Sequence, residues 1–520
     1  MPRFGAIDVG SNAIRLRVVE VHQPRADASQ LDLALPPDAE WREVASQRAP
    51  VRLGTEVFLT GKLTPASIGA ACAALRDFKS AMDDARVDAY RAVATSAVRE
   101  ASNSATFVER ARREAGIDLE VIEGVEEARI IELAVARRLG DAWRDALLVD
   151  VGGGSTELTH LADGEHASSV SLPIGTVRLL EQFASKGAAL DKKGARLLAE
   201  AIERVLAEAL PRLRSVRFGA VVGTGGNVET LADLCPQKGG VGPHRAIDVA
   251  AMRAFYNKAI RLSAAERREA YGLRPDRADT IVPATAIFLR VAEALDAPSV
   301  VAPGVGLKEG ILDELALKHF QLWDVEGQAS SVLAACVKLG RRYQFDEAHG
   351  ALVAELSAAI FDDMQPVHGL GPRERLLLRA AATLHDVGDF VRYDGHHKHS
   401  YYLILNSDLI GLTPEERAIV ANVARYHRKS LPDASHPNFR DLERDARAKV
   451  RALAAILRIA DALDREHLGK VKLVRAGVDR ERRKLRLTVI GQEDRELEEW
   501  TVRQKADLLR DVFDLDVAIE

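Results

Sequence analysis

Carboxylates, glycines and hydroxyls gather in one short stretch of the chain, where the apolar run 146–149 ends at Asp150 and Glu157 follows shortly after. Glycines between the two carboxylates let the main chain come close to a ligand, so that successive N–H groups can converge on a phosphate. Carboxylate oxygens on both sides of such a turn can hold Mg²⁺ beside a polyanion. We therefore expect a phosphate-binding turn with a magnesium site, and a ligand-free glycine hairpin is the alternative. The phosphate-binding candidates are Gly152, Gly153, Gly154, Ser155 and Thr156, and the magnesium ligands are Asp150 and Glu157.

The same order of strand, aspartate, glycine and polar side chain occurs at the start of the chain. Residues 3–9 and 13–21 predict two strands joined by a tight turn. A third glycine-rich turn, 223–227, follows the apolar run 218–222 and adds Gly225. A lone turn of this kind often serves backbone geometry only, but its repetition predicts duplicated lobes that hold a phosphate chain from opposite sides. The candidates of the first turn are Asp8, Gly10, Ser11, Asn12 and Arg15.

Three charged side chains outside these turns are also candidates. Arg99 follows the predicted strand 89–94, at the strand end where open α/β sheets bind anions, and its guanidinium can donate two hydrogen bonds to a phosphate. An exposed arginine in a surface ion pair is the alternative. Glu127 lies near the start of a predicted helix, where it can take a proton from water, although acidic residues there also complement the helix dipole. Lys308, just before a predicted helix, is a further candidate for contact with phosphate.

Alternating strands and helices must hold these residues. Helical spacing over 64–82, with Thr64 as N-cap, precedes the strand 89–94, and the helix that begins near 124 ends at about 139. Residues 23–41 contain three prolines and predict a loop or insertion of unassigned role. From about 321 the pattern changes to long amphipathic helices, and 471–520 predicts a small mixed region of strands and helices.

Composition narrows the class of protein. A chain of 520 residues, with 47% hydrophobic and 29% charged residues, predicts about three or four globular domains. Its net charge of −5 offers no overall basic field, so we expect no nucleic-acid partner. The three cysteines are far apart in sequence and predict buried thiols in a reducing compartment. We expect neither a signal peptide nor a membrane span, and a cytoplasmic protein.

Six motifs lie at residues 8–15, 94–101, 124–129, 150–157, 175–179 and 306–310. In this order they resemble the exopolyphosphatase/guanosine pentaphosphate phosphatase family of the actin/hexokinase/Hsp70-type superfamily. The resemblance implies two ribonuclease-H-like lobes with the polyphosphate end between them. It also implies that Glu127 activates water, that Asp150 and Glu157 serve Mg²⁺, and that Arg99 and the main-chain amides of 152–155 hold terminal phosphates. Lys308 departs from the family pattern, in which an arginine is more usual. A lysine there weakens bidentate contact with a phosphate.

The carboxyl-terminal helices carry a second candidate metal site. His349, the pair His385-Asp386 and Asp461 form a series that resembles the HD phosphohydrolase superfamily, whose helical bundle gathers such side chains around a divalent metal. Imidazoles and carboxylates suit transition metals such as Mn²⁺, Fe²⁺ or Zn²⁺. Histidines in the segments 395–400 and 425–429 either complete a second metal site or, with the neighbouring basic residues, form a surface for a polyphosphate tail.

These observations predict an α/β fold of two ribonuclease-H-like lobes with an interlobe cleft, followed by an all-α HD-type bundle and a small α+β end domain. The expected domains are 1–125, 126–315, 316–468 and 469–520, and we expect a homodimer. The leading function is Mg²⁺-dependent removal of terminal phosphate from inorganic polyphosphate, and the nearest alternative is removal of the 5′-phosphate of guanosine pentaphosphate. A sugar or acetate kinase and a non-catalytic alarmone sensor are alternatives from other classes.

Overall fold

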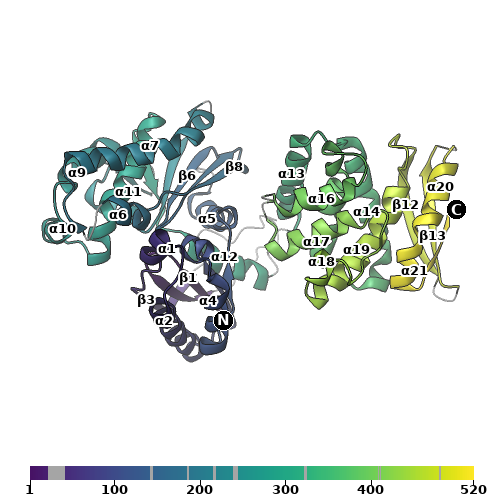
Figure 1. Cartoon of the computed structure of the whole chain (residues 1–520), viewed down its shortest axis with the longest axis horizontal. Helices are drawn as coiled ribbons and strands as arrows, with labels where there is room; N and C mark the ends of the chain where they lie inside the picture. The colour runs from purple at the N-terminus through teal and green to yellow at the C-terminus, as the bar shows by residue number, and fades with distance from the viewer. Residues whose placement is uncertain are drawn as a thin grey trace. The chain divides into compact units, whose positions relative to one another are not determined.

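The chain divides into two compact units, residues 1–323 and 324–520 (Figure 1). A computed structural model describes residues 1–21, 41–140, 144–183, 187–214, 218–237, 244–320, 325–407, 409, 411–479, 482–492 and 494–519. The predicted insertion 23–41 lies outside the described residues except for its last residue, Trp41, which begins a strand. The division into four domains is finer than the two units and stays a prediction.

Unit 1 contains two sheets with the same strand order. The first has the order β3-β2-β1-β4-β5, and the second, read from its other edge, has the order β8-β7-β6-β9-β11-β10. In each sheet three antiparallel strands continue into two parallel ones, and the second sheet adds the antiparallel edge strand β10. The predicted duplication is therefore confirmed. The strands of the first sheet are β1 Arg3–Val9, β2 Ile14–Val21, β3 Trp41–Ala49, β4 Ala89–Ala94 and β5 Leu119–Val121. Those of the second are β6 Ala146–Val151, β7 Thr156–Ala162, β8 Glu165–Leu172, β9 Ala220–Gly225, β10 Arg245–Asp248 and β11 Ser299–Ala302.

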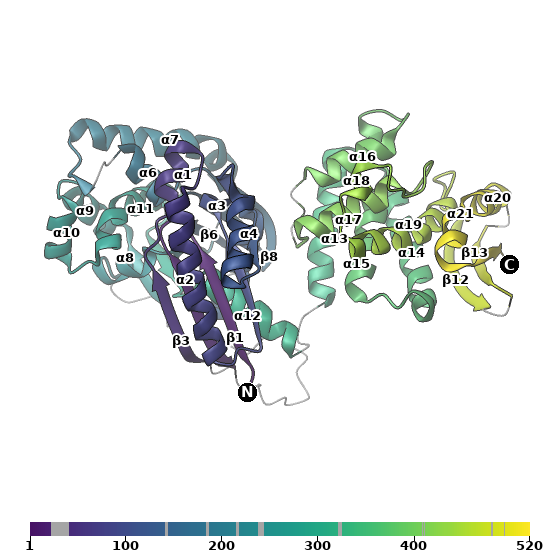
Figure 2. The ribbon, with the colours of Figure 1, turned by 60° about the horizontal axis from the view of Figure 1, so that its bottom comes forward.

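Helices cover both sheets of unit 1. In the first lobe α2 lies along the sheet, as Figure 2 shows, and its buried face packs with β1 and β2. The predicted cap of α2 is present, since the Thr64 side chain accepts a hydrogen bond from Ser67 N. The helices are α1 Gly54–Thr60, α2 Pro65–Asp84, α3 Ser96–Glu100, α4 Ser104–Ala115, α5 Gly124–Leu139, α6 Thr176–Phe183, α7 Lys192–Arg214, α8 Val228–Leu234, α9 Val249–Ala259, α10 Ala264–Tyr271, α11 Pro275–Ala294 and α12 Leu307–His319.

Helix α5 connects the two lobes and packs on both. Ile130 belongs to a buried cluster with the first sheet and α12, whereas Ile131 belongs to one with the second sheet. Helix α12 crosses α5 closely, because a Cβ on Gly310 would lie 1.9 Å from Ile130 O. Arg91 and Arg129 both pair with the buried carboxylate of Glu314 on α12. The start of α5 is therefore held firmly between the lobes.

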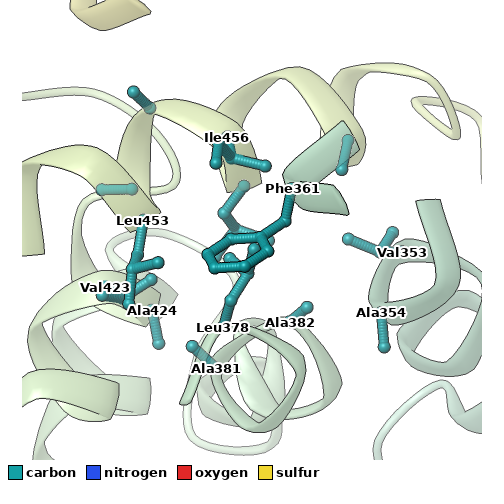
Figure 3. Close-up of a cluster of buried hydrophobic side chains, with 14 of the residues drawn as sticks. Val353, Ala354, Phe361, Leu378, Ala381, Ala382, Val423, Ala424, Leu453 and Ile456 are labelled. Atoms are coloured by element: carbon teal, nitrogen blue, oxygen red, sulfur yellow. The ribbon is translucent and has the colours of Figure 1, made fainter. Parts of the chain in front are cut away.

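Unit 2 is a helical bundle that shares one hydrophobic core with a small three-stranded sheet. Phe361 lies at the centre of this core beside Leu378 and Leu453 (Figure 3). The helices are α13 Val325–Arg342, α14 Glu347–His368, α15 Pro372–Leu384, the 3₁₀ helix η3 Val387–Phe390, α16 His396–Leu405, α17 Pro414–Arg425, α18 Pro437–Arg440 and α19 Arg444–Ala462. The end region contains β12 Val471–Asp479, β13 Lys484–Gly491, α20 Glu496–Lys505, α21 Asp507–Phe513 and β14 Asp516–Ile519.

The predicted helical region and mixed end region are therefore present, and the HD-type assignment of the bundle stays a prediction. One detail of that prediction is wrong: His385 and Asp386 follow the last residue of α15 instead of lying inside a helix. None of the helices in the described part of the chain combines the length and apolar character that a membrane span requires.

Candidate active site

Strand register brings the predicted carboxylates and their partners together. Asp8 on β1 lies opposite Arg15 on β2, and the two form an ion pair of 3.1 Å. Asp150 on β6 lies between Glu157 on the antiparallel β7 and Thr224 on the parallel β9. Neighbouring strands place such residues side by side even where they are distant in sequence.

A cavity of about 480 Å³ runs between the turns of the two lobes. Twelve of the predicted residues line it: Asp8, Gly10, Ser11, Asn12, Arg15, Glu127, Asp150, Gly152, Gly153, Ser155, Gly225 and Lys308. The other four of unit 1 are not among the described lining residues: Arg99, Gly154, Thr156 and Glu157. Thr156 is buried, and its hydroxyl donates to Ile174 O.

Three buried carboxylates converge at one side of this cavity. One oxygen from each of Glu127, Asp150 and Glu157 lies within 4.8 Å of the others. Burial raises the pKa of Glu127 well above its usual range, and the negative charges of Glu157 and Asp150 raise it further. Burial also raises the pKa of Asp150 to about 6, against the hydrogen bond of 2.6 Å that Thr224 Oγ1 donates. Within the described part of the chain, Glu127 Oε2 and Glu157 Oε2 are buried without a hydrogen-bond donor. This donor set fits a divalent cation with oxygen ligands.

Arg99 contacts the candidate base Glu127. Its Nη1 lies 3.6 Å from Glu127 Oε2 and donates a hydrogen bond of 2.7 Å to Ile122 O. The guanidinium opposes the rise in the pKa of Glu127. In this structure Arg99 therefore positions the carboxylate of Glu127 and favours its charged form. Its contact with phosphate stays a prediction.

The glycine turn after Asp150 is held by the start of α6. The carbonyl of Gly152 accepts from Thr176 N, that of Gly153 from Val177 N, and that of Gly154 from Arg178 Nε. In a trans peptide the C=O and the following N–H point in opposite directions. The N–H groups of residues 153–155 consequently point away from α6, an arrangement that suits anion binding. The prediction for the amide of Gly152 is not met, because that N–H donates to Ser155 O at 3.0 Å.

Glycine is required in this turn by close packing. A Cβ on Gly154 would lie 2.2 Å from Phe58 Cζ in the first lobe, and one on Gly153 would lie 2.7 Å from Ser11 Cβ. A Cβ on Gly175 would lie 2.5 Å from main-chain atoms of Gly153 and Gly154. The two lobes therefore touch at the glycines that the sequence singles out.

Sequence reasoning missed an arginine cluster along the same cavity. Arg48 lies opposite Arg15 in the register of β2 and β3, and Arg274 and Arg277 approach from the start of α11. Burial and the neighbouring arginines lower the pKa of Arg277 to about 10. Like charges directly opposite on a sheet are destabilising. Asp8 pairs with Arg15 and Asp276 with Arg48, and a ligand of opposite charge would relieve the remaining repulsion. Only the register of β3, which was not predicted, reveals the pair of arginines.

Paired lobes with glycine turns that face one cavity define a two-lobed fold of the actin type. The profile of the Ppx/GppA phosphatase family matches residues 38–319, and the profile of Ppx/GppA phosphatase domain III matches residues 333–509. The first match spans more than half of the chain, so this protein belongs to the Ppx/GppA phosphatase family. It is accordingly a phosphoanhydride hydrolase, which disfavours the kinase and sensor alternatives.

Known proteins resemble the chain over most of its length or over about three fifths of it. A protein of Vibrio vulnificus named guanosine-5′-triphosphate,3′-diphosphate pyrophosphatase is 27% identical over 432 residues, which are 83% of this chain and 81% of that protein. The crystal structure of the Aquifex aeolicus Ppx/GppA family member matches with a TM-score of 0.50 and 28% identity, and covers 61% of this chain and 98% of its own. A structure named exopolyphosphatase from Cytophaga hutchinsonii matches with a TM-score of 0.52, 23% identity and coverages of 61% and 98%, and supports the fold.

Proposed function

We propose that this protein removes the terminal phosphate of the 5′-triphosphate group of guanosine pentaphosphate. The observation that carries the proposal is the joint presence, along one cavity, of a buried carboxylate cluster and an arginine cluster. The carboxylates suit attack by water on a phosphoanhydride, and the arginines suit the remaining phosphates. The name of the relative from Vibrio vulnificus supports this substrate over inorganic polyphosphate.

In the proposed mechanism Glu127 accepts a proton from the attacking water. Hydrolysis of a phosphoanhydride requires in-line positioning and neutralisation of charge more than covalent chemistry by the protein. A general base works best when its pKa lies near the working pH, and burial raises that of Glu127 in this direction. Arg99, next to Glu127, orients the carboxylate and favours its charged form.

We further propose that Asp150 and Glu157 hold Mg²⁺. Their buried oxygens are suitable ligands, and Glu157 Oε2 is buried without a hydrogen bond in the described part of the chain. When bound, the ion would neutralise charge on the terminal phosphates and offset the carboxylates next to Glu127. The main-chain amides of residues 153–155 would hold the oxygens of the departing phosphate.

The arginine cluster supports a substrate with several phosphates beyond the one that is cleaved. Arg15 and Arg48 stand opposite each other, and Gly226 leaves room for Arg277, whose Nη1 would lie 2.5 Å from a Cβ at that position. Asp8 pairs with Arg15 and Asp276 with Arg48, and the positive charge that these carboxylates leave suits an anionic ligand. A single terminal phosphate does not require such a cluster, whereas a pentaphosphate carries charge enough to neutralise it.

Inorganic polyphosphate is the second candidate, and one observation favours it. Among the described residues that line the cavity there is no aromatic side chain on which guanine could stack. A chain of phosphates needs no such surface, and it would pair equally well with the arginines.

Purified protein should be incubated separately with guanosine pentaphosphate, long-chain polyphosphate and ATP in the presence of Mg²⁺, and released phosphate measured as kcat/KM. We expect the highest value for guanosine pentaphosphate and the lowest for ATP. A higher value for polyphosphate would select the second candidate. Release from ATP alone, or from none of the three, would contradict both.

A further inference from the structure

Six polar side chains of unit 2 converge inside the helical bundle, far along the chain from the cavity residues. His349 comes from α14, His396 from α16 and Asp461 from α19, while His385, Asp386 and His427 lie just after α15 and α17. The four histidines are at most 2% exposed. The Nε2 atoms of His349 and His385 are 3.2 Å apart, and those of His396 and His427 are 3.3 Å apart.

The outer nitrogen of each ring already faces an acceptor. His385 Nδ1 lies 2.7 Å from Ala382 O, and His427 Nδ1 lies 2.6 Å from Ala424 O. His349 Nδ1 lies 2.7 Å from the Asp464 carboxylate, and His396 Nδ1 lies 2.5 Å from that of Asp389. Backbone carbonyls and carboxylates only accept, so Nδ1 of His349, His385 and His427 carries the proton. His396 Nδ1 is close to Asp389 but makes no hydrogen bond within the described residues. Such outer partners are typical of histidines that bind metals.

The inner nitrogens face one another in two pairs, and that of His396 also lies near Arg428 Nη1. When Nδ1 of a neutral imidazole carries the proton, Nε2 is an acceptor. Arg428 Nη1, which can only donate, lies 3.3 Å from His396 Nε2 and independently indicates this tautomer. Two facing lone pairs repel each other unless a cation or a proton lies between them. The carboxylates of Asp386 and Asp461 next to these pairs favour a multiply charged cation.

Asp386 divides the cluster into two ligand groups. Its Oδ2 lies 3.5 Å from His385 Nε2 on one side, and its Oδ1 lies 3.1 Å from His396 Nε2 and 3.4 Å from His427 Nε2 on the other. The first group is His349, His385 and Asp386, and the second is Asp386, His396 and His427. Within each group the candidate ligand atoms lie within 4.8 Å of one another. A carboxylate in this position can bridge two ions.

We propose that unit 2 binds two divalent first-row transition-metal ions that share Asp386 as a bridging ligand. One ion would take His349, His385 and Asp461 in addition, and the other His396 and His427. Imidazole ligands select Zn²⁺, Mn²⁺, Fe²⁺ or Co²⁺ over Mg²⁺. Lys505 pairs with Asp461 Oδ2 and leaves Oδ1 directed at His385, 3.5 Å away.

The proposal is tested by titrating the full-length protein, freed of metal, with Co²⁺ and following the visible absorption of the bound ion. We expect two equivalents with imidazole ligation, which X-ray absorption of the loaded wild type detects directly. No histidine is among the described residues that line the cavity of unit 1, so this signal distinguishes the two sites.

Three variants complete the test, and circular dichroism checks that each is folded. Asp386→Asn, which keeps the size of the side chain, should lose both equivalents, and His427→Ala should lose one. His399→Ala removes a histidine of the same helix as His396, outside the cluster, and should keep both. Equal uptake by wild type and Asp386→Asn, or no imidazole signal in the wild type, would overturn the site. Uptake of only one equivalent by the wild type, unchanged in His427→Ala, would overturn the two-ion arrangement. Neither Co²⁺ uptake nor the imidazole signal in X-ray absorption depends on hydrolysis in unit 1.

Discussion

Replacing Gly175 by alanine should damage catalysis although Gly175 is not itself among the residues that line the cavity. A Cβ at this position would lie 2.5 Å from main-chain carbons of Gly153 and Gly154, whereas ordinary contact begins at 3.4 Å. The glycine turn or the start of α6 must therefore shift by about 0.9 Å. Because backbone atoms meet the new group, no side-chain rotation can relieve the clash.

Two magnitudes follow from this shift. Overpacking of a tight interior costs about 1–3 kcal/mol of unfolding free energy. A displacement of about 1 Å in groups that position a substrate costs roughly 10²-fold in rate. We therefore expect Gly175→Ala to lose about 10²-fold in kcat while remaining folded at room temperature.

The assay measures phosphate release at saturating substrate together with thermal unfolding. Gly69→Ala is the matched control, because a Cβ on this glycine of α2 meets nothing within 4 Å. It should retain full activity and gain about 1 kcal/mol of stability. An activity of Gly175→Ala within about threefold of the wild type, at unchanged unfolding temperature, would refute the claim that the turn is held by this contact.

Three further outcomes follow from the charges of unit 1. Arg99→Met should move the acidic limb of the kcat/KM profile to higher pH, since Arg99 lowers the pKa of Glu127; a limb at the wild-type pH would contradict this. Thr224→Val should raise the Mg²⁺ concentration required for half-maximal activity about 10–100-fold, because Asp150 loses its hydrogen bond. Titration of activity with Mg²⁺ measures this concentration, and an unchanged midpoint would argue against Asp150 as a ligand. Arg129, Arg91 and Lys318 together outweigh burial and hold the pKa of Glu314 at about 2. Glu314→Gln should therefore cost about 3–5 kcal/mol at pH 7, and the deficit should shrink as pH falls from about 4 towards 2. Urea unfolding at pH 7 and at low pH checks this, and a deficit independent of pH would contradict it.

The features that sequence predicted are those encoded within a few neighbouring residues. The turn after Asp150, the cap at Thr64 and the early position of Glu127 in its helix each depend on local residue types, and the structure has them where they were expected. The duplicated strand–turn–strand pattern is local as well, and its repetition predicted the two lobes.

The features that sequence did not predict depend on contacts between distant segments. Thr224 reaches Asp150 only through the parallel register of β6 and β9, and Arg48 meets Arg15 only through the pairing of β2 and β3. Arg99 was predicted to bind phosphate from its place after a strand, but the position of its guanidinium depends on the start of α5, to which Glu127 belongs. Register and helix crossing are set by the packing of whole elements, which residue spacing does not specify.

Single-turnover hydrolysis by Glu127→Gln tests the central claim most directly. The substitution keeps the size of the side chain and removes its ability to accept a proton. We predict a rate lower by about 10²–10⁴-fold with little change in substrate affinity. A rate within about threefold of the wild type at saturating substrate would show that Glu127 is not the base that readies water for attack.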